Sequence, residues 1–171
     1  FDGYNFKEYR FTPGAFGVGD SYISSIFLDS TGSTDTFYVG TRIGVYKFDP
    51  IKEQFTLLLK TNGEVGSILK DQGQRLWVIA GKKLTCYNIR THKKQIFNPR
   101  NHFQPTSVCM TAEGQIWVST ADGKLCRYDP SGGPGGEFTS YDLFADTLHQ
   151  PTKWIENLFV TRQGLILAGT S

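Results

Sequence analysis

The sequence has no uninterrupted run of 18 or more apolar residues, so no stretch of it could cross a membrane as a helix. It also has no basic, apolar, small-residue leader, so we expect any export signal to lie upstream of Phe1 or to have been removed. A strong excess of either charge is missing as well, since 18 Lys and Arg against 16 Asp and Glu give a net charge of +2. Nucleic-acid binding usually needs a clustered basic face, so we expect no contact with DNA or RNA.

Cysteine is scarce, and the sequence contains no CxxC pair that would suggest a zinc site. Each of the three cysteines lies within an apolar, strand-like run, which favours buried, reduced thiols over disulfides. They are Cys86, Cys109 and Cys126. The three histidines fall in three separate loops, so we expect neither a metal site nor a cofactor.

The sequence does contain one pattern that recurs several times. Leu76-Trp77-Val78 is similar to Ile116-Trp117-Val118 and, more loosely, to residues 37–39 and 166–168. Trp77 and Trp117 are 40 residues apart, and Tyr38 precedes Trp77 by 39. A period of about 40 to 45 residues with four strand-like runs is typical of a β-propeller blade. Because both tryptophans hold the same strand position, we expect them to pack between blades.

Alternation of apolar residues and turn chemistry divides the chain into blade-like repeats at 22–59, 65–98, 106–143 and, incompletely, 154–171. The expected strands are 23–28, 36–40, 45–48 and 54–59, then 65–69, 75–79, 84–89 and 94–97, then 106–110, 115–120, 124–128 and 137–141, and finally 155–161 and 165–169. No helical periodicity competes over any useful length.

Both ends of the chain break the pattern. Residues 4–11 look like the outer strand of a preceding blade, and the last repeat stops after two strands. We therefore expect an all-β chain, a β-propeller fragment of four-stranded antiparallel blades with about three full blades and partial blades at both ends. Because each blade buries an apolar face against its neighbour, such a fragment should pack against further propeller blades or associate with itself.

The repeat resembles the two-component regulator propeller repeat. The matching stretches are 68–78, 113–120 with 125–130, and 38–50. This resemblance implies the periplasmic sensor region of a bacterial hybrid two-component system, attached to the inner membrane through domains outside these residues. It further implies recognition of an oligosaccharide, with signalling to histidine kinase domains that these residues do not contain.

In a propeller, one face around the central channel is built from the loops that enter each blade and the turns between its second and third strands, and function is expected on such loops. Aromatic rings can stack on sugars while cationic groups bind oxygens, which would suit an acidic glycan. The residues on this face that we expect to bind ligand are Arg42, Lys82, Lys83, Arg100, His102, His149 and Trp154.

Two other functions remain open. A carbohydrate-active lyase or hydrolase would need paired carboxylates or another catalytic set. The carboxylates expected on the same face, Asp20, Glu64, Asp122 and Asp146, show no recurring pair, and no nucleophile motif is present, so we expect no catalytic residue. A protein-interaction scaffold is the third possibility, although the Trp-Asp dipeptides of the WD repeat are missing.

Overall fold

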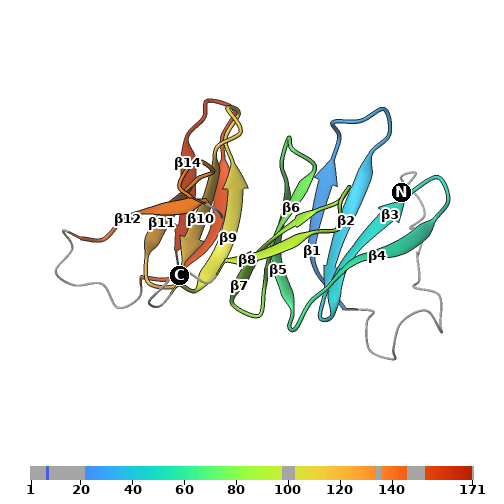
Figure 1. The fold of residues 1–171 in the computed structure, drawn as a ribbon, viewed down its shortest axis with the longest axis horizontal. Helices are drawn as coiled ribbons and strands as arrows, with labels where there is room; N and C mark the ends of the chain where they lie inside the picture. The colour runs from blue at the N-terminus through green and yellow to red at the C-terminus, as the bar shows by residue number, and fades with distance from the viewer. Residues whose placement is uncertain (1–6, 8–21, 98–102, 134–135, 146–152, 171) are drawn as a thin grey trace.

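The computed structural model describes residue 7 and residues 22–97, 103–133, 136–145 and 153–170. These residues form three four-stranded antiparallel sheets and one two-stranded sheet (Figure 1). The strands are β1 (Ile23–Asp29), β2 (Thr36–Thr41), β3 (Gly44–Asp49), β4 (Gln54–Lys60), β5 (Val65–Lys70), β6 (Arg75–Ala80), β7 (Lys83–Asn88), β8 (Lys94–Phe97), β9 (Pro105–Met110), β10 (Ile116–Thr120), β11 (Lys124–Asp129), β12 (Glu137–Asp142), β13 (Ile155–Val160) and β14 (Ile166–Thr170). Among these residues there is no helix of the length and apolarity needed to span a bilayer.

Each strand begins and ends within one residue of the position that the repeat predicts. Within each sheet the strands pair in chain order, so every connection is a hairpin. The first strands β1, β5, β9 and β13 contact one another in succession, and Figure 1 shows the sheets following each other in chain order. This is the arrangement of propeller blades, and it confirms the expected fold class. The strand expected at 4–11 lies, apart from Lys7, outside the described residues.

The core lies between neighbouring sheets and repeats the same side-chain positions. Trp77 is completely buried, with its ring centroid 5.5 Å from that of Phe97 in its own sheet and 4.8 Å from that of Tyr128 in the next. Trp117 holds the equivalent position and lies 5.7 Å from Tyr141. The predicted packing of Trp77 between blades is confirmed. Trp117 is half-buried, and its ring contact with Tyr141 lies within its own blade, so its packing between blades stays a prediction.

The three cysteines are free and buried in this core, as expected. Burial raises the pKa of the Cys86 and Cys109 thiols to about 11, because a thiolate would lose its hydration there. Both thiols are therefore protonated at neutral pH. They act as small apolar side chains and not as nucleophiles.

The first two strands of every sheet share an irregularity at the same place. In the second sheet Val65 pairs with Ala80 and Ser67 pairs with Ile79, which leaves Gly66 as an extra residue. The equivalent extra residues in the other sheets are Ser24, Thr106 and Glu156. A β-bulge of this kind bends the strand and redirects the extra side chain. We call Ser24, Gly66, Thr106 and Glu156 the bulge residues.

In the first three sheets, the residue after the bulge ties one blade to the next. The hydroxyl of Ser25 donates a hydrogen bond to the carbonyl oxygen of Val65 at 2.9 Å. The equivalent hydroxyls accept from the following blade: Ser67 from the amide of Val108 at 3.3 Å, and Ser107 from the amide of Leu158 at 3.1 Å. The bulges and the inner strands that carry them are thus held in register across all the sheets.

Candidate functional site

The bulge residues of three successive sheets surround a cavity of about 280 Å³. We call it the rim hollow, because it lies where strands β5, β9 and β13 begin. The second sheet supplies Glu64, Gly66, Ile79, Gly81 and Lys82, the third supplies Gln104, Pro105, Thr106 and Ala121, and the fourth supplies Trp154 and Glu156. A hollow lined by several rigid strands, with a few polar groups among apolar ones, is the usual form of a small-ligand site.

Trp154 contributes the aromatic surface of the hollow and remains 43% exposed. Trp154 is the residue immediately before β13. Glu64 and Gln104 occupy the equivalent positions immediately before β5 and β9. Before β1 the same position is held by Tyr22, which is 49% exposed and lies under the guanidinium of Arg42, with the Arg42 Cζ 4.6 Å from the ring centroid. The repeat thus presents two exposed aromatic rings at equivalent positions, with polar residues between them.

Among the described residues, the charges lining the hollow are two carboxylates and one ammonium group. Glu64 and Glu156 supply the carboxylates and Lys82 the ammonium, and all three residues are exposed. Within the part of the chain that the structure describes, none of the three side chains makes an ion pair.

Lys82 is placed by a two-residue hairpin turn in which both residues have positive φ, 53° for Gly81 and 64° for Lys82. This geometry belongs to a type I′ turn, which normally carries Gly or Asn at both positions. The turn is fixed by the Gly81 amide, which donates to the carbonyl oxygen of Glu64 at 3.3 Å. The same contact brings the start of β5 and the tip of the β6–β7 hairpin together at the hollow.

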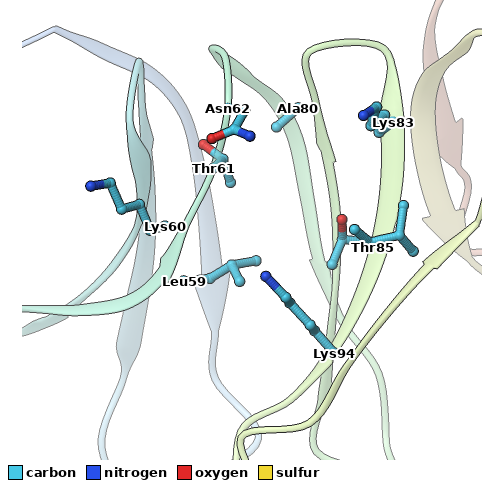
Figure 2. A pocket seen from close by; sticks show the side chains of 9 residues that line it. Leu59, Lys60, Thr61, Asn62, Ala80, Lys83, Thr85 and Lys94 are labelled. Carbon is cyan, nitrogen blue, oxygen red and sulfur yellow. The ribbon is translucent and has the colours of Figure 1, made fainter.

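A second, smaller hollow of about 120 Å³ lies between β4 and the outer strands β7 and β8. Its lysines are Lys60, Lys83 and Lys94. Figure 2 shows Lys94 reaching between Leu59 and Thr85, while Lys60 points away and Lys83 lies at the far rim. Because the ammonium groups do not converge, this hollow lacks the arrangement needed to hold an anion.

The structure divides the expected ligand-binding residues among separate places. Lys82 and Trp154 line the rim hollow together, whereas Lys83 belongs to the smaller hollow and Arg42 stacks on Tyr22. Arg100, His102 and His149 lie outside the described residues, so their role stays a prediction.

Sequence reasoning missed the bulge residues of the hollow, namely Gly66, Thr106 and Glu156. The sequence feature that could have revealed one of these bulges is Gly66, since an isolated glycine inside a strand pattern often marks a bulge.

Of the carboxylates expected on this face, Asp122 is engaged by neighbours in its own β10–β11 hairpin. The Asp122 carboxylate accepts hydrogen bonds from the Thr120 hydroxyl and the Lys124 ammonium, each at 2.6 Å. Burial alone would raise the pKa of Asp122, but these two bonds outweigh it and hold the pKa below its ordinary value. Asp20 and Asp146 lie outside the described residues. Within the described ranges, no three His, Cys, Asp or Glu side chains gather closely enough to hold a metal ion.

No family model matches the sequence, and no curated protein matches it. Solved structures do. The extracellular domain of a protein named as a hybrid two component system of B. thetaiotaomicron superposes with a TM-score of 0.72 at 23% identity, covering 99% of this chain and 22% of that one. A second such domain from the same organism gives 0.65 at 20% identity, covering 88% of this chain and 22% of its own.

This chain spans about a fifth of the length of the two component system domains that it matches. Virginiamycin B lyase from Staphylococcus aureus is more distant, with a TM-score of 0.63 at 11% identity over 84% of this chain and 47% of the enzyme. At these identities the likeness concerns fold alone. The repeat that the sequence resembles and the folds that it superposes on agree: the chain has the fold of a β-propeller of the kind found in extracellular domains of hybrid two component systems.

Proposed function

We propose that this chain is part of the ligand-sensing, periplasmic β-propeller region of a hybrid two-component sensor, and that it recognises an oligosaccharide at the rim hollow. The signal passes to kinase domains outside these residues. The likeness to extracellular domains of hybrid two component systems supports the sensor role and the extracytoplasmic location. The chain itself carries no chemistry in this proposal.

The observation that carries the proposal is the exposed ring of Trp154 in a hollow that is also lined by the exposed charged residues Glu64, Lys82 and Glu156. A large aromatic side chain left partly in water loses the stabilisation that burial would give it. A pyranose ring could cover its face, while Glu64, Gln104 and Thr106 bind the hydroxyl groups at the ring edge. Aromatic stacking with hydrogen bonds at the periphery matches the mixed polarity of a sugar.

Binding would signal by shifting an equilibrium between arrangements of the sensor. A ligand can shift such an equilibrium only by its difference in affinity for the two states. The rim hollow is built from three sheets, so its shape depends on how neighbouring blades sit against one another. A ligand that bridges Lys82 and Trp154 would favour the arrangement in which those two residues are correctly spaced.

The sheets at the two ends of the array expose apolar side chains that the middle sheets bury. On β14, Leu167 is 53% exposed although it holds the position at which Trp77 is fully buried, and on β13, Phe159 is 65% exposed. On β1, Ile26 is 62% exposed.

We propose that further blades of the same polypeptide cover both faces. Sedimentation should then show the 171 residues alone associating. A longer polypeptide with additional blades should stay monomeric, and a stable monomer of this chain would contradict the proposal.

The oligosaccharide proposal is tested by calorimetry against a panel of oligosaccharides, with product analysis on the same mixtures. We expect binding without turnover, and we expect Trp154→Ala to weaken it by about 10-fold to 100-fold, since each factor of ten is about 1.4 kcal/mol. Ile51→Ala, which shortens an exposed side chain in the β3–β4 hairpin, is the matched control. Accumulating oligosaccharide products would instead indicate a lyase or hydrolase, and binding to a protein alone would indicate a scaffold.

A further inference from the structure

Gly66 is a glycine that the fold itself does not require. Its φ is not in the left-handed region, unlike that of Gly63, Gly81 or Gly123. A Cβ built on Gly66 would meet no atom within 4 Å. Gly40, by contrast, could not carry a Cβ without a contact of 2.3 Å to the Ser25 hydroxyl. Neither backbone conformation nor packing within the described chain therefore explains the glycine at position 66.

Glycine at this position has a measurable disadvantage. In a strand it loses more conformational entropy on folding than any other residue and packs no side chain, so it is destabilising relative to alanine. The other bulge residues show that the same backbone accepts side chains, since Ser24, Thr106 and Glu156 occupy the equivalent positions. Gly66 also lines the rim hollow, so the space its side chain would fill is part of that cavity.

We propose that Gly66 is the floor of a subsite that seats one ring of the ligand, and that a side chain at this position closes the subsite. Glycine within a strand is found where another group must approach the backbone closely. This inference rests on the proposed function for the identity of the ring, because the cavity by itself would also admit a ring that is not a sugar.

The charged groups beside Gly66 determine which substituents the bound ring can have. The carboxylates of Glu64 and Glu156 accept hydrogen bonds from hydroxyl or amino groups, and they repel a carboxylate or a sulfate. Of the lining residues that the structure describes, Lys82 is the one that carries a positive charge. The subsite therefore takes a neutral or amine-bearing sugar and rejects an acidic one, which departs from the acidic glycan that the basic residues of the sequence suggested.

The test compares Gly66→Leu with Gly32→Leu. Gly32 lies in the β1–β2 hairpin, at the opposite end of its sheet from the bulge, and its φ is not left-handed; a Cβ there meets only backbone atoms, at 3.6 Å or more. Each variant is titrated by calorimetry with β-1,4-linked tetramers of glucose, glucosamine, N-acetylglucosamine and mannuronate, and with a set of tetrapeptides. Thermal unfolding is recorded for each variant.

We expect the neutral or amine-bearing tetramers to bind at least 10-fold more tightly than the mannuronate tetramer. Gly66→Leu should weaken that binding by at least 100-fold, with a melting temperature within a few degrees of the wild type, and Gly32→Leu should bind like the wild type. If Gly66→Leu does not fold, Gly66→Ser, which the bulge accommodates at Ser24, should still weaken binding by about 10-fold.

If the Gly66 variants bind saccharides as the wild type does, or if the mannuronate tetramer binds most tightly, the proposed subsite is wrong but the proposed oligosaccharide sensor is not. If only a peptide binds, and Gly66→Leu abolishes that binding, the subsite is supported and the oligosaccharide proposal is wrong. If no probe binds the wild type, both proposals fall.

Discussion

The carboxylate of Asp71 accepts a hydrogen bond of 3.0 Å from the indole Nε1 of Trp77, inside the core. The same carboxylate accepts from the backbone amide and the guanidinium Nε of Arg75, at 2.9 and 2.6 Å. One buried side chain in the β5–β6 hairpin thereby closes the turn and fixes the tryptophan that packs against the next blade.

Replacing Asp71 with alanine should therefore destabilise the protein strongly. The change leaves the buried indole donor of Trp77 without an acceptor and opens the hairpin turn, which together should lower the free energy of unfolding by about 3 kcal/mol. Urea denaturation measures this. The control is Thr111→Ala at the equivalent position of the third sheet, where an uncharged hydroxyl accepts a longer bond of 3.3 Å from the Gln115 amide and bonds the Glu113 carboxylate. Equal losses for the two variants would contradict the role given to Asp71.

The ion pair between Asp29 and Lys70 should make stability depend on pH. It joins β1 to β5 at 2.9 Å, with both side chains largely buried. Burial would raise the pKa of Asp29, but hydrogen bonds from Thr31 and Lys70 outweigh it and hold the pKa below its ordinary value of 3.8. The stabilisation is thus fully present above about pH 4 and is lost as the pH falls through the lowered folded-state pKa.

Urea unfolding from pH 7 down to pH 2 tests this. The wild type should lose stability below pH 4 more steeply than Asp29→Asn, which should already be less stable at pH 7. Asp35→Asn, in the exposed hairpin between β1 and β2, should follow the wild-type curve. Parallel curves for the wild type and Asp29→Asn would contradict a contribution from this pair.

The serine hydroxyls between inner strands should control local opening between blades. Ser107→Ala removes the acceptor of the Leu158 amide, a bond of 3.1 Å, and should cost about 1 kcal/mol. Hydrogen exchange at the Leu158 amide should then become about fivefold faster. Ser33→Ala, in the β1–β2 hairpin, should leave that rate unchanged. An unchanged rate in Ser107→Ala would show that the hydroxyl does not join the blades.

The thiols should be unreactive while the protein is folded. Because burial raises the pKa of Cys86 and Cys109 to about 11, almost no thiolate exists at pH 8. Treatment with iodoacetamide at pH 8, followed by mass spectrometry, should show no labelling of the native protein and full labelling in urea. Rapid labelling of the native protein would mean that the sheets around these cysteines open readily.

Strand boundaries were predictable because the signals that set them are local. Turns such as Asp71-Gln72-Gly73-Gln74 and the Asp-Pro pairs after Phe48 and Tyr128 mark the strand ends. The shared register of Trp77 and Trp117 follows from the period of the repeat.

The site was predictable only in part. Lys82 and Trp154 could be placed on one face because turn and loop positions follow from strand order. The bulges could not be found in this way, because an extra residue is defined by the pairing of two strands and not by either strand alone. Lys83 was expected in the turn beside Lys82 because the strand was expected to begin at residue 84, whereas β7 begins at Lys83.

A crystal structure of the protein with the tightest-binding saccharide tetramer tests the proposed subsite most directly. We predict that one sugar ring lies over Gly66, with its face against Trp154 and its edge within hydrogen-bond distance of Glu64 or Glu156. A ligand seated instead at the opposite ends of the sheets, beside the hairpins at 30–35 or 112–114, would contradict it.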